Sequence, residues 1–326
     1  MNRKFYTAAA VVLIAISGTG AFAQKGKVAD APSVPDVVQI PGGQFSESYI
    51  ISESGSYRLA GDRSMLNGSA VSAIVISAPN VTLDLGGHTI SGVGTKSAAS
   101  GIEAVVPVGL IVENVRVFNG TVQGFGNTGL LLNVNSVSVE SVRSLDNGAR
   151  GIHVALNGTV MDCMAMENGT AGIQIAMGRV LNTVASYNGT YGIAIGTGRV
   201  EGCEVGNNVA SGIQCSGNSI VRNNRILYNN TGNIGWASGV VCDLGSQIVD
   251  NYFCENKVTA IRASRGTLVR GNSISNAVIF SIGITAYGSG VDHQAVAKDN
   301  VFSGQVNDFM GLVYDAGGNV LMQGAY

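Results

Sequence analysis

Short runs of alternating apolar and polar residues recur along this chain at a nearly constant interval. The clearest copies are NGARGIHV at 147–154, NGTAGIQI at 168–175, NGTYGIAI at 188–195 and NNVASGIQC at 207–215. A second short run follows the first copies, as at 160–165 and 180–185. Because the same strand recurs instead of a complementary partner, the pattern predicts parallel strands that stack coil upon coil.

The apolar residue after each glycine marks one position per coil. Weaker copies extend the pattern in both directions, and successive marked positions are 20–28 residues apart. The marked residues are Ile74, Ile102, Leu130, Ile152, Ile173, Ile193, Ile213, Val240, Ile261, Ile284 and Leu312. We therefore expect an all-β solenoid of about ten coils, with one strand of each coil beginning at a marked residue.

The same alignment predicts which side chains stack on one another. Asparagines lie five residues before the marked isoleucines, at 147, 168, 188 and 208. Stacked asparagines can form a hydrogen-bonded ladder, and asparagine tolerates the left-handed conformation of a sharp turn. Two further columns are expected: valine at 139, 160, 180, 200 and 221, and small or turn-forming residues at 142, 163, 183, 203 and 224, followed by asparagine at 251, 272 and 300.

The repeat resembles right-handed parallel β-helix proteins of the pectate-lyase-like superfamily over about residues 70–315. The segment VTLDLGGHTI at 81–90 looks like an early coil of secreted bacterial members, and GSYRL at 55–59 looks like their capping region. The resemblance implies a single-stranded right-handed parallel β-helix. It does not fix an activity, because this fold carries lyases, hydrolases, epimerases and non-enzymatic adhesins.

The N-terminus has the features of a bacterial-type secretory signal. Arg3 and Lys4 precede a short apolar core at 8–16, and Ala21-Phe22-Ala23 fits a cleavage site. Nine apolar residues are too few to span a bilayer, and no later segment approaches a transmembrane length. We expect a periplasmic or secreted protein with a signal peptide at 1–23, a linker at 24–43, an N-terminal cap at 44–70, coils at 71–302, and the last coil with a C-terminal cap at 303–326.

Composition narrows the function classes. Glycine accounts for 46 of the 326 residues, which disfavours a helical bundle. The net charge of −2 with only 19 Lys and Arg gives no electrostatic footprint for nucleic acid, and we expect no nucleic-acid partner. The five cysteines cannot all pair with one another. Cys215 and Cys242 occupy equivalent positions in successive coils, where either a disulfide or two buried thiols would fit.

One outward-facing column offers candidate chemistry. The outward residues of the first strand lie at 103, 131, 153, 174, 194, 214, 241 and 262. With the flanking turns they predict a polar patch in which His153, Arg150 and Tyr191 are candidate catalytic residues. His153 would act as a base, Arg150 would pair with a sugar carboxylate, and Tyr191 would stack on a sugar or donate a proton. The candidate substrate-binding residues are Gln174, Gln214 and Arg262, and the alternative is an ordinary solvated face.

Other catalytic patterns of this fold are missing from the sequence. Hydrolases of the fold use two or three close aspartates, and no such aspartate pattern occurs. The Asp-Pro-His signature of alginate epimerases is also missing, since Asp292-His293 shares only the aspartate and the histidine. No metal site or cofactor is evident, and calcium bound together with an acidic sugar stays an open alternative.

Two functions follow from these observations. The first is a protein that binds or acts on a polysaccharide, with lyase-like action on an acidic polymer. The second is a non-catalytic adhesin or envelope structural protein. The enlarged intervals 213–240 and 284–312 distinguish them, because loops that enclose His153 or Arg262 on one side would create a groove.

Overall fold

A computed structural model describes residues 36–326 except 68, 95–97, 108–110, 276–281, 288–294, 305–306, 312 and 323–326. All described residues belong to the unit Pro35–Tyr326. The expected signal peptide, most of the expected linker, and Asp292-His293 lie outside the described residues.

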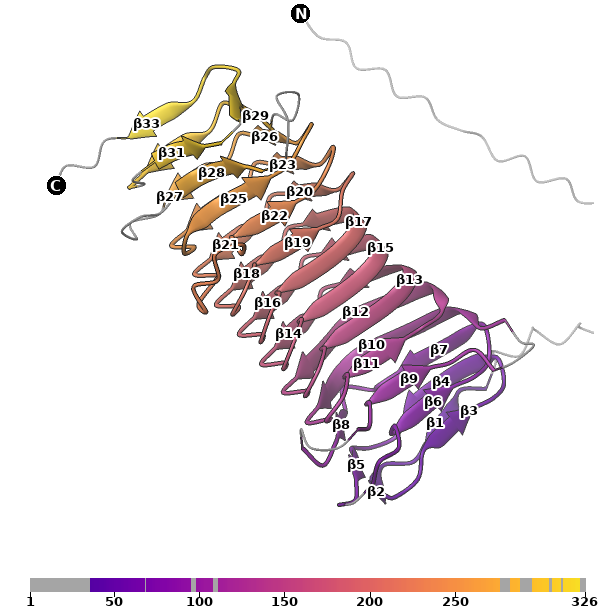
Figure 1. The fold of residues 1–326 in the computed structure, drawn as a ribbon. Coiled ribbons are helices and arrows are strands. Elements are labelled where there is room, and N and C mark those ends of the chain that lie inside the picture. Colours follow the sequence, from indigo (N-terminus) through magenta and orange to yellow (C-terminus); the bar gives the residue numbers. More distant parts are fainter. Residues whose placement is uncertain are drawn as a thin grey trace, which may run out of the picture. The chain divides into compact units, whose positions relative to one another are not determined.

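Each coil contributes short strands to three parallel sheets, here called faces A, B and C (Figure 1). Face A consists of β3(Tyr49–Ile51), β6(Ile74–Ile76), β9(Ile102–Ala104), β11(Leu130–Leu132), the first parts of β13(Ile152–Met161), β15(Ile173–Leu181) and β17(Ile193–Glu201), then β19(Ile213–Cys215), β22(Val240–Cys242), β25(Thr259–Ala263), β28(Ile282–Ala286) and β31(Asn307–Met310).

Faces B and C complete each coil. Face B consists of β1(Val38–Ile40), β4(Gly55–Leu59), β7(Val81–Asp84), the first parts of β10(Glu113–Gln123) and β12(Asn135–Leu145), the last parts of β13, β15 and β17, then β20(Ile220–Arg222), β23(Gln247–Val249), β26(Leu268–Arg270), β29(Ala295–Lys298) and β32(Val313–Asp315). Face C consists of β2(Gly43–Phe45), β5(Arg63–Met65), β8(Thr89–Ser91), the last parts of β10 and β12, then β14(Met164–Met166), β16(Val184–Ser186), β18(Glu204–Gly206), β21(Arg225–Leu227), β24(Tyr252–Cys254), β27(Ser273–Ser275), β30(Val301–Ser303) and β33(Val320–Met322).

The predicted parallel β-helix is confirmed, with no helix among the described residues. Among the described residues face A has twelve strands, somewhat more than the expected ten coils. The strands begin earlier than residue 71, because Val38 already pairs with Tyr57 and Tyr49 with Ile74. The same coil-to-coil strand pairing therefore continues across the expected boundaries at 43/44 and 70/71.

One marked position at the C-terminal end was wrong. Phe309, and not Leu312, lies opposite Ile284 on face A. The ring of Phe309 packs edge-on against Phe302 at a centroid distance of 5.3 Å, which places Phe309 beside the end of the apolar interior. Leu312 itself lies outside the described residues.

The interior is filled by the inward residues of all three faces. The marked isoleucines Ile152, Ile173, Ile193 and Ile213 are completely buried, and so are the valines of the second predicted column from 139 to 221. A fully buried side chain of this size contributes roughly 1.5–3 kcal/mol relative to an exposed one. Stacking of like residues therefore stabilises every coil against its neighbours.

The predicted asparagine ladder is present and longer than expected, and the asparagines of the third predicted column form a second ladder. In the first, each Nδ2 donates to the Oδ1 of the next coil at 2.8–3.0 Å, from Asn147 through Asn168, Asn188, Asn208 and Asn229 to Asn256. The second joins Asn224, Asn251, Asn272, Asn300 and Asn319 at 2.9–3.0 Å. The backbone N–H of the donor residue also bonds to the next Oδ1, so each turn is fixed against the following one.

Charged side chains on the outer surface pair between neighbouring coils. Arg222 Nη2 lies 2.6 Å from Glu201 Oε1, and Arg225 Nη1 lies 3.4 Å from Glu204 Oε2. The hydrogen bond from Arg222 is the main cause that holds the pKa of Glu201 below its ordinary value. These carboxylates serve the stacking of coils.

The cysteines are free thiols. Cys215 pairs with Cys242 in the strand register, and both are buried with no disulfide between them. Burial raises the pKa of the Cys163 thiol to about 11.

Within the described ranges there is no helix long and apolar enough to cross a membrane.

Candidate functional site

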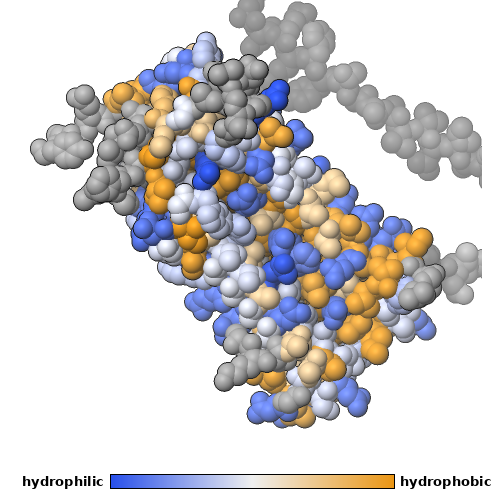
Figure 2. Space-filling view, in the orientation of Figure 1, coloured by the Kyte–Doolittle hydropathy of each residue, from blue (hydrophilic) through white to orange (hydrophobic). Residues whose placement is uncertain are grey.

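The outward column of face A has the predicted register. Leu131 lies opposite His153, His153 opposite Gln174, and Gln174 opposite Ala194. The column then continues through Gln214, Val241 and Arg262. The strands that carry these residues follow one another along the stack of coils (Figure 1), and apolar and polar side chains mix over the coils in the same view (Figure 2).

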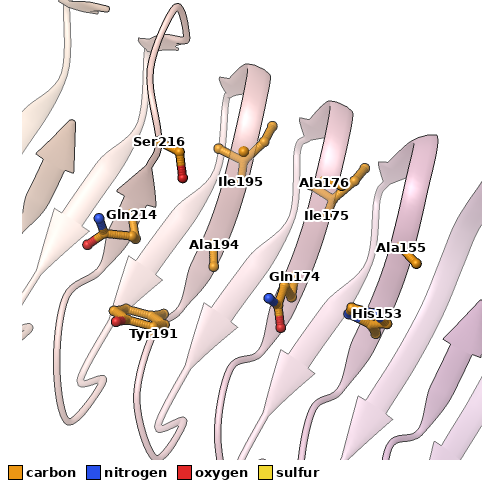
Figure 3. A pocket seen from close by; sticks show the side chains of 11 residues that line it. His153, Ala155, Gln174, Ile175, Ala176, Tyr191, Ala194, Ile195, Gln214 and Ser216 are labelled. Atoms are coloured by element: carbon orange, nitrogen blue, oxygen red, sulfur yellow. The ribbon is translucent and has the colours of Figure 1, made fainter. Parts of the chain in front are cut away.

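A continuous depression, here called the face A groove, runs over this column. One part, of about 450 Å³, is lined by His153, Gln174, Tyr191 and Gln214 together with small and aliphatic residues (Figure 3). The adjoining part, of about 370 Å³, is lined by Tyr191, Gln214, Trp236, Val241, Arg262 and Tyr287. Tyr191 and Gln214 line both parts, so the groove passes from one to the other. Five of the six candidate residues predicted from the sequence therefore line this one groove.

His153 lies at one end of the groove, on β13. Its Nδ1 is buried and has no hydrogen-bond partner among the described residues. Burial lowers the pKa of this imidazole, and the nearby positive charge of Arg150 lowers it further. The side chain is therefore neutral near pH 7 and able to accept a proton.

Arg150, in the turn before β13, is the one candidate that does not line the groove. Its Nε donates a hydrogen bond to Oε1 of Gln174 in the next coil. Within the part of the chain that the structure describes, no carboxylate forms an ion pair with Arg150. Its guanidinium is thus a cation fixed beside His153, and no described carboxylate neutralises it.

The other end of the groove is aromatic. The rings of Tyr191 and Trp236 are tilted by 55° with centroids 6.2 Å apart. The guanidinium of Arg262 lies over the ring of Tyr287, 4.8 Å from its centroid. The hydroxyl of Tyr287 donates to Oδ1 of Asp243, and burial together with this bond raises the pKa of Tyr287 well above its ordinary value. Tyr287 is therefore a neutral phenol.

The two ends of the groove are far apart. Five successive pairings separate His153 from Arg262 along the column. At ~4.8 Å per coil this is roughly 24 Å. Tyr191, two coils beyond His153, is ~10 Å away along the axis on the same basis. The candidates thus divide into His153, Arg150 and Gln174 at one end, and Tyr191, Gln214 and Arg262 at the other.

Sequence reasoning missed Trp236, Tyr287 and Asp243. The signal for Trp236 was available, since the only tryptophan of the chain lies in the enlarged interval 213–240. That loop lines the groove next to Arg262, as a groove-forming loop should. The second enlarged interval is described only in part, because 288–294 and 312 lie outside the described residues.

The groove offers few acids. None of its lining residues is an aspartate or glutamate, so the described part holds no carboxylate pair for two-acid hydrolysis. No group of three His, Cys, Asp or Glu suited to a metal ion occurs among the described residues. The ionisable side chains in and beside the groove are a neutral imidazole, the phenols of Tyr191 and Tyr287, and the guanidinium ions of Arg150 and Arg262.

No protein-family model matches the chain, and no curated protein is significantly similar to it. Solved structures share its fold. The A-module of mannuronan C-5 epimerase AlgE4 from Azotobacter vinelandii aligns with a TM-score of 0.67 and 16% identity, over 87% of this chain and 91% of the module. The catalytic unit of a GH87 alpha-1,3-glucanase from Streptomyces thermodiastaticus aligns with a TM-score of 0.66 and 18% identity, over 87% of this chain and 62% of that unit.

A third similar structure is the enzymatically active domain of tailspike protein 2 from bacteriophage CBA120. It aligns with a TM-score of 0.53 and 15% identity, over 67% of this chain and 38% of that one. At such identities the likeness concerns the fold alone. The chain is a right-handed parallel β-helix, a fold that it shares with enzymes whose names describe action on polysaccharides.

Proposed function

We propose that the face A groove binds an extended acidic polysaccharide along the axis of the β-helix. The observation that carries this proposal is the charge of the groove. Arg150 lies beside His153 at one end and Arg262 lines the other end, while none of the lining residues is an aspartate or glutamate. Neither arginine forms an ion pair with a carboxylate among the described residues. Two oriented cations in a groove without acids suit a ligand that carries carboxylates.

The residues between the two arginines suit a sugar chain. The amides of Gln174 and Gln214 each offer both donors and acceptors for sugar hydroxyls. The rings of Tyr191 and Trp236 offer apolar surface with a polar edge, which suits sugar rings. One contact per coil matches a polymer that lies across successive coils.

A lyase-like reaction is the second candidate, and His153 favours it. The neutral imidazole would take the proton at C5 of a uronate residue while Arg150 pairs with the carboxylate. The electron pair then forms the C4–C5 double bond, the bond from C4 to the glycosidic oxygen breaks, and that oxygen takes a proton from water. Since Tyr191 lies two coils away from His153, we assign it to sugar binding and not to this proton transfer.

The proposal also concerns the cellular compartment in which the protein acts. A signal peptide at 1–23 would deliver the chain to the periplasm or the exterior, where such polymers occur. The measurement that tests this step is the N-terminal sequence of protein recovered from the periplasm and the medium. A mature chain that begins at Gln24 would support it, and an intact N-terminus in the cytoplasm would contradict it.

Binding and reaction are tested separately. Calorimetric titration with pectate and alginate oligomers should show binding by the wild type and weaker binding by Arg150→Gln and Arg262→Gln. The matched control is Arg270→Gln, an exposed arginine on face B. Equal weakening in all three variants would mean unspecific charge attraction and would overturn the groove proposal.

The reaction is followed by the ultraviolet absorbance of unsaturated uronate ends, with and without calcium. His153→Ala should bind the polymer and release no unsaturated ends. Full product release by this variant would exclude His153 as the base. Binding without product in the wild type would instead support the non-catalytic adhesin.

A further inference from the structure

We infer that the loop 228–239 forms an anchoring subsite, which binds one uronate ring of the polymer at Trp236 independently of His153. This inference rests on the proposed function and states which part of the groove contributes most of the affinity for the polymer. It makes Asn230 a positioning residue, because this side chain fixes the loop that carries the tryptophan.

Asn230 holds the loop from within. Its side chain is completely buried, and its backbone has the left-handed φ of 63°. Oδ1 accepts from Ile234 N at 2.7 Å, while Nδ2 donates to Ile234 O at 2.9 Å and to Ala237 O at 3.2 Å. These bonds are made on both sides of Trp236. The loop therefore has one defined shape before any ligand arrives.

Trp236 uses that shape to present its ring. Its side chain is 48% exposed, although the ring packs against Tyr191. A large apolar ring held half in water on a fixed loop gains little from folding and offers its free surface to a ligand. The cavity beside it contains two further rings, those of Tyr191 and Tyr287.

Arg262 gives the cavity its charge preference. The guanidinium is held over the ring of Tyr287, and the hydroxyl of Tyr287 is held by Asp243. Oδ1 of Asp243 accepts the bond from the phenol, and no carboxylate among the described residues forms an ion pair with Arg262. A carboxylate on a sugar ring stacked at Trp236 would supply the partner that Arg262 lacks.

The position of the subsite sets a length requirement. Val241, in the middle of the cavity lining, is four pairings from His153, which corresponds to ~19 Å. Short oligosaccharides can therefore occupy the anchor without reaching His153. Longer oligosaccharides reach both the anchoring subsite and His153. The length of the oligosaccharide therefore decides whether it contacts the imidazole.

The only tryptophan of the chain is a built-in reporter. Uronate oligomers of increasing length, with neutral oligomers of equal length as the charge control, are titrated against the mature protein. Trp236 fluorescence and the NMR signal of the His153 ring are followed together. Short uronates should change the fluorescence alone, and longer ones should change both signals.

Three variants and one control variant complete the test. Trp236→Ala and Arg262→Gln should weaken the binding of short uronates at least about tenfold, a free-energy change well within one lost stacking or ionic contact. Asn230→Ala should weaken it and shift the tryptophan emission of the free protein. Asn272→Ala, a buried ladder asparagine remote from the groove, is the control, because it should lower the melting temperature without changing the affinity.

The possible failures are distinguishable. Uronate binding that is unchanged in Trp236→Ala and Arg262→Gln would overturn the anchoring subsite and leave the groove proposal standing. No binding of any uronate would overturn both. Equal loss of affinity in Asn230→Ala and Asn272→Ala would remove the positioning role, since general destabilisation would then explain it.

Discussion

Replacing Asn188 by alanine should lower the stability of the β-helix sharply, because it removes the middle of a buried ladder. The side chain is completely buried. Its Nδ2 donates to Ala165 O at 3.1 Å and to Asn208 Oδ1 at 3.0 Å. Its Oδ1 accepts from the backbone N–H and the Nδ2 of Asn168 at 3.2 and 3.0 Å. The substitution therefore removes four hydrogen bonds at once.

The structure also limits the loss. Nδ2 of Asn168 keeps its bond to Ser144 O, and Oδ1 of Asn208 keeps its bond from Asn188 N. The backbone N–H of Asn168 loses its acceptor. With about 1 kcal/mol per hydrogen bond, and up to about 3 kcal/mol for a buried group left unpaired, we expect a loss of about 3–4 kcal/mol in the free energy of unfolding.

The assay is urea unfolding followed by far-ultraviolet circular dichroism. The matched control is Gln247→Ala, which truncates an exposed amide on face B and should change the free energy by less than about 0.5 kcal/mol. A loss of less than about 1 kcal/mol for Asn188→Ala would refute the reasoning. An equal loss for Gln247→Ala would show that the ladder is not the cause.

Gly178→Ala should lower the melting temperature far more than Gly87→Ala. Both glycines have positive φ, but only at 178 would a Cβ meet backbone, 1.8 Å from an oxygen of the neighbouring coil; equal shifts would contradict the tight stacking. Arg222→Gln should raise the pKa of the Glu201 carboxyl toward its ordinary value in an NMR titration, and an unchanged pKa would mean that the pair does not form in solution. His153→Gln should make the free energy of unfolding less dependent on pH below about 6.5. The lowered pKa of His153 means that the unfolded chain binds more protons, so stability falls as the pH drops below about 6.5, and an unchanged slope would contradict this.

The stacking could be predicted because the columns repeat in the sequence itself. Asn168 and Asn188 stand at equal distances before Ile173 and Ile193, and parallel pairing turns that spacing directly into contact. The start of the coils was less visible, since the first strands lack the Asn-Gly turns of the middle coils. The apolar alternation at Val38 and Ile40 was nevertheless present, and it pairs with Tyr57 and Leu59.

The aromatic end of the groove could not be predicted in the same way. Trp236 lies in a loop that interrupts the repeat, where column position no longer specifies where a side chain lies. Tyr287 and Asp243 are 44 residues apart and meet because each follows a face A strand, two coils apart. A periodic pattern places strands, whereas turns and loops that depart from it must be located in space.

The uniform coils between Asn147 and Asn208 have a consequence for how such a protein can change. Each of these coils bonds through its asparagine only to the coil before it and the coil after it. Duplication of one unit of about twenty residues would continue the ladder and the apolar interior without altering either. It would also move His153 and Arg262 apart by one step of ~4.8 Å. The reach of the groove is therefore adjustable by gene duplication in whole steps, and selection for a longer or shorter ligand could act on the number of coils instead of on individual side chains.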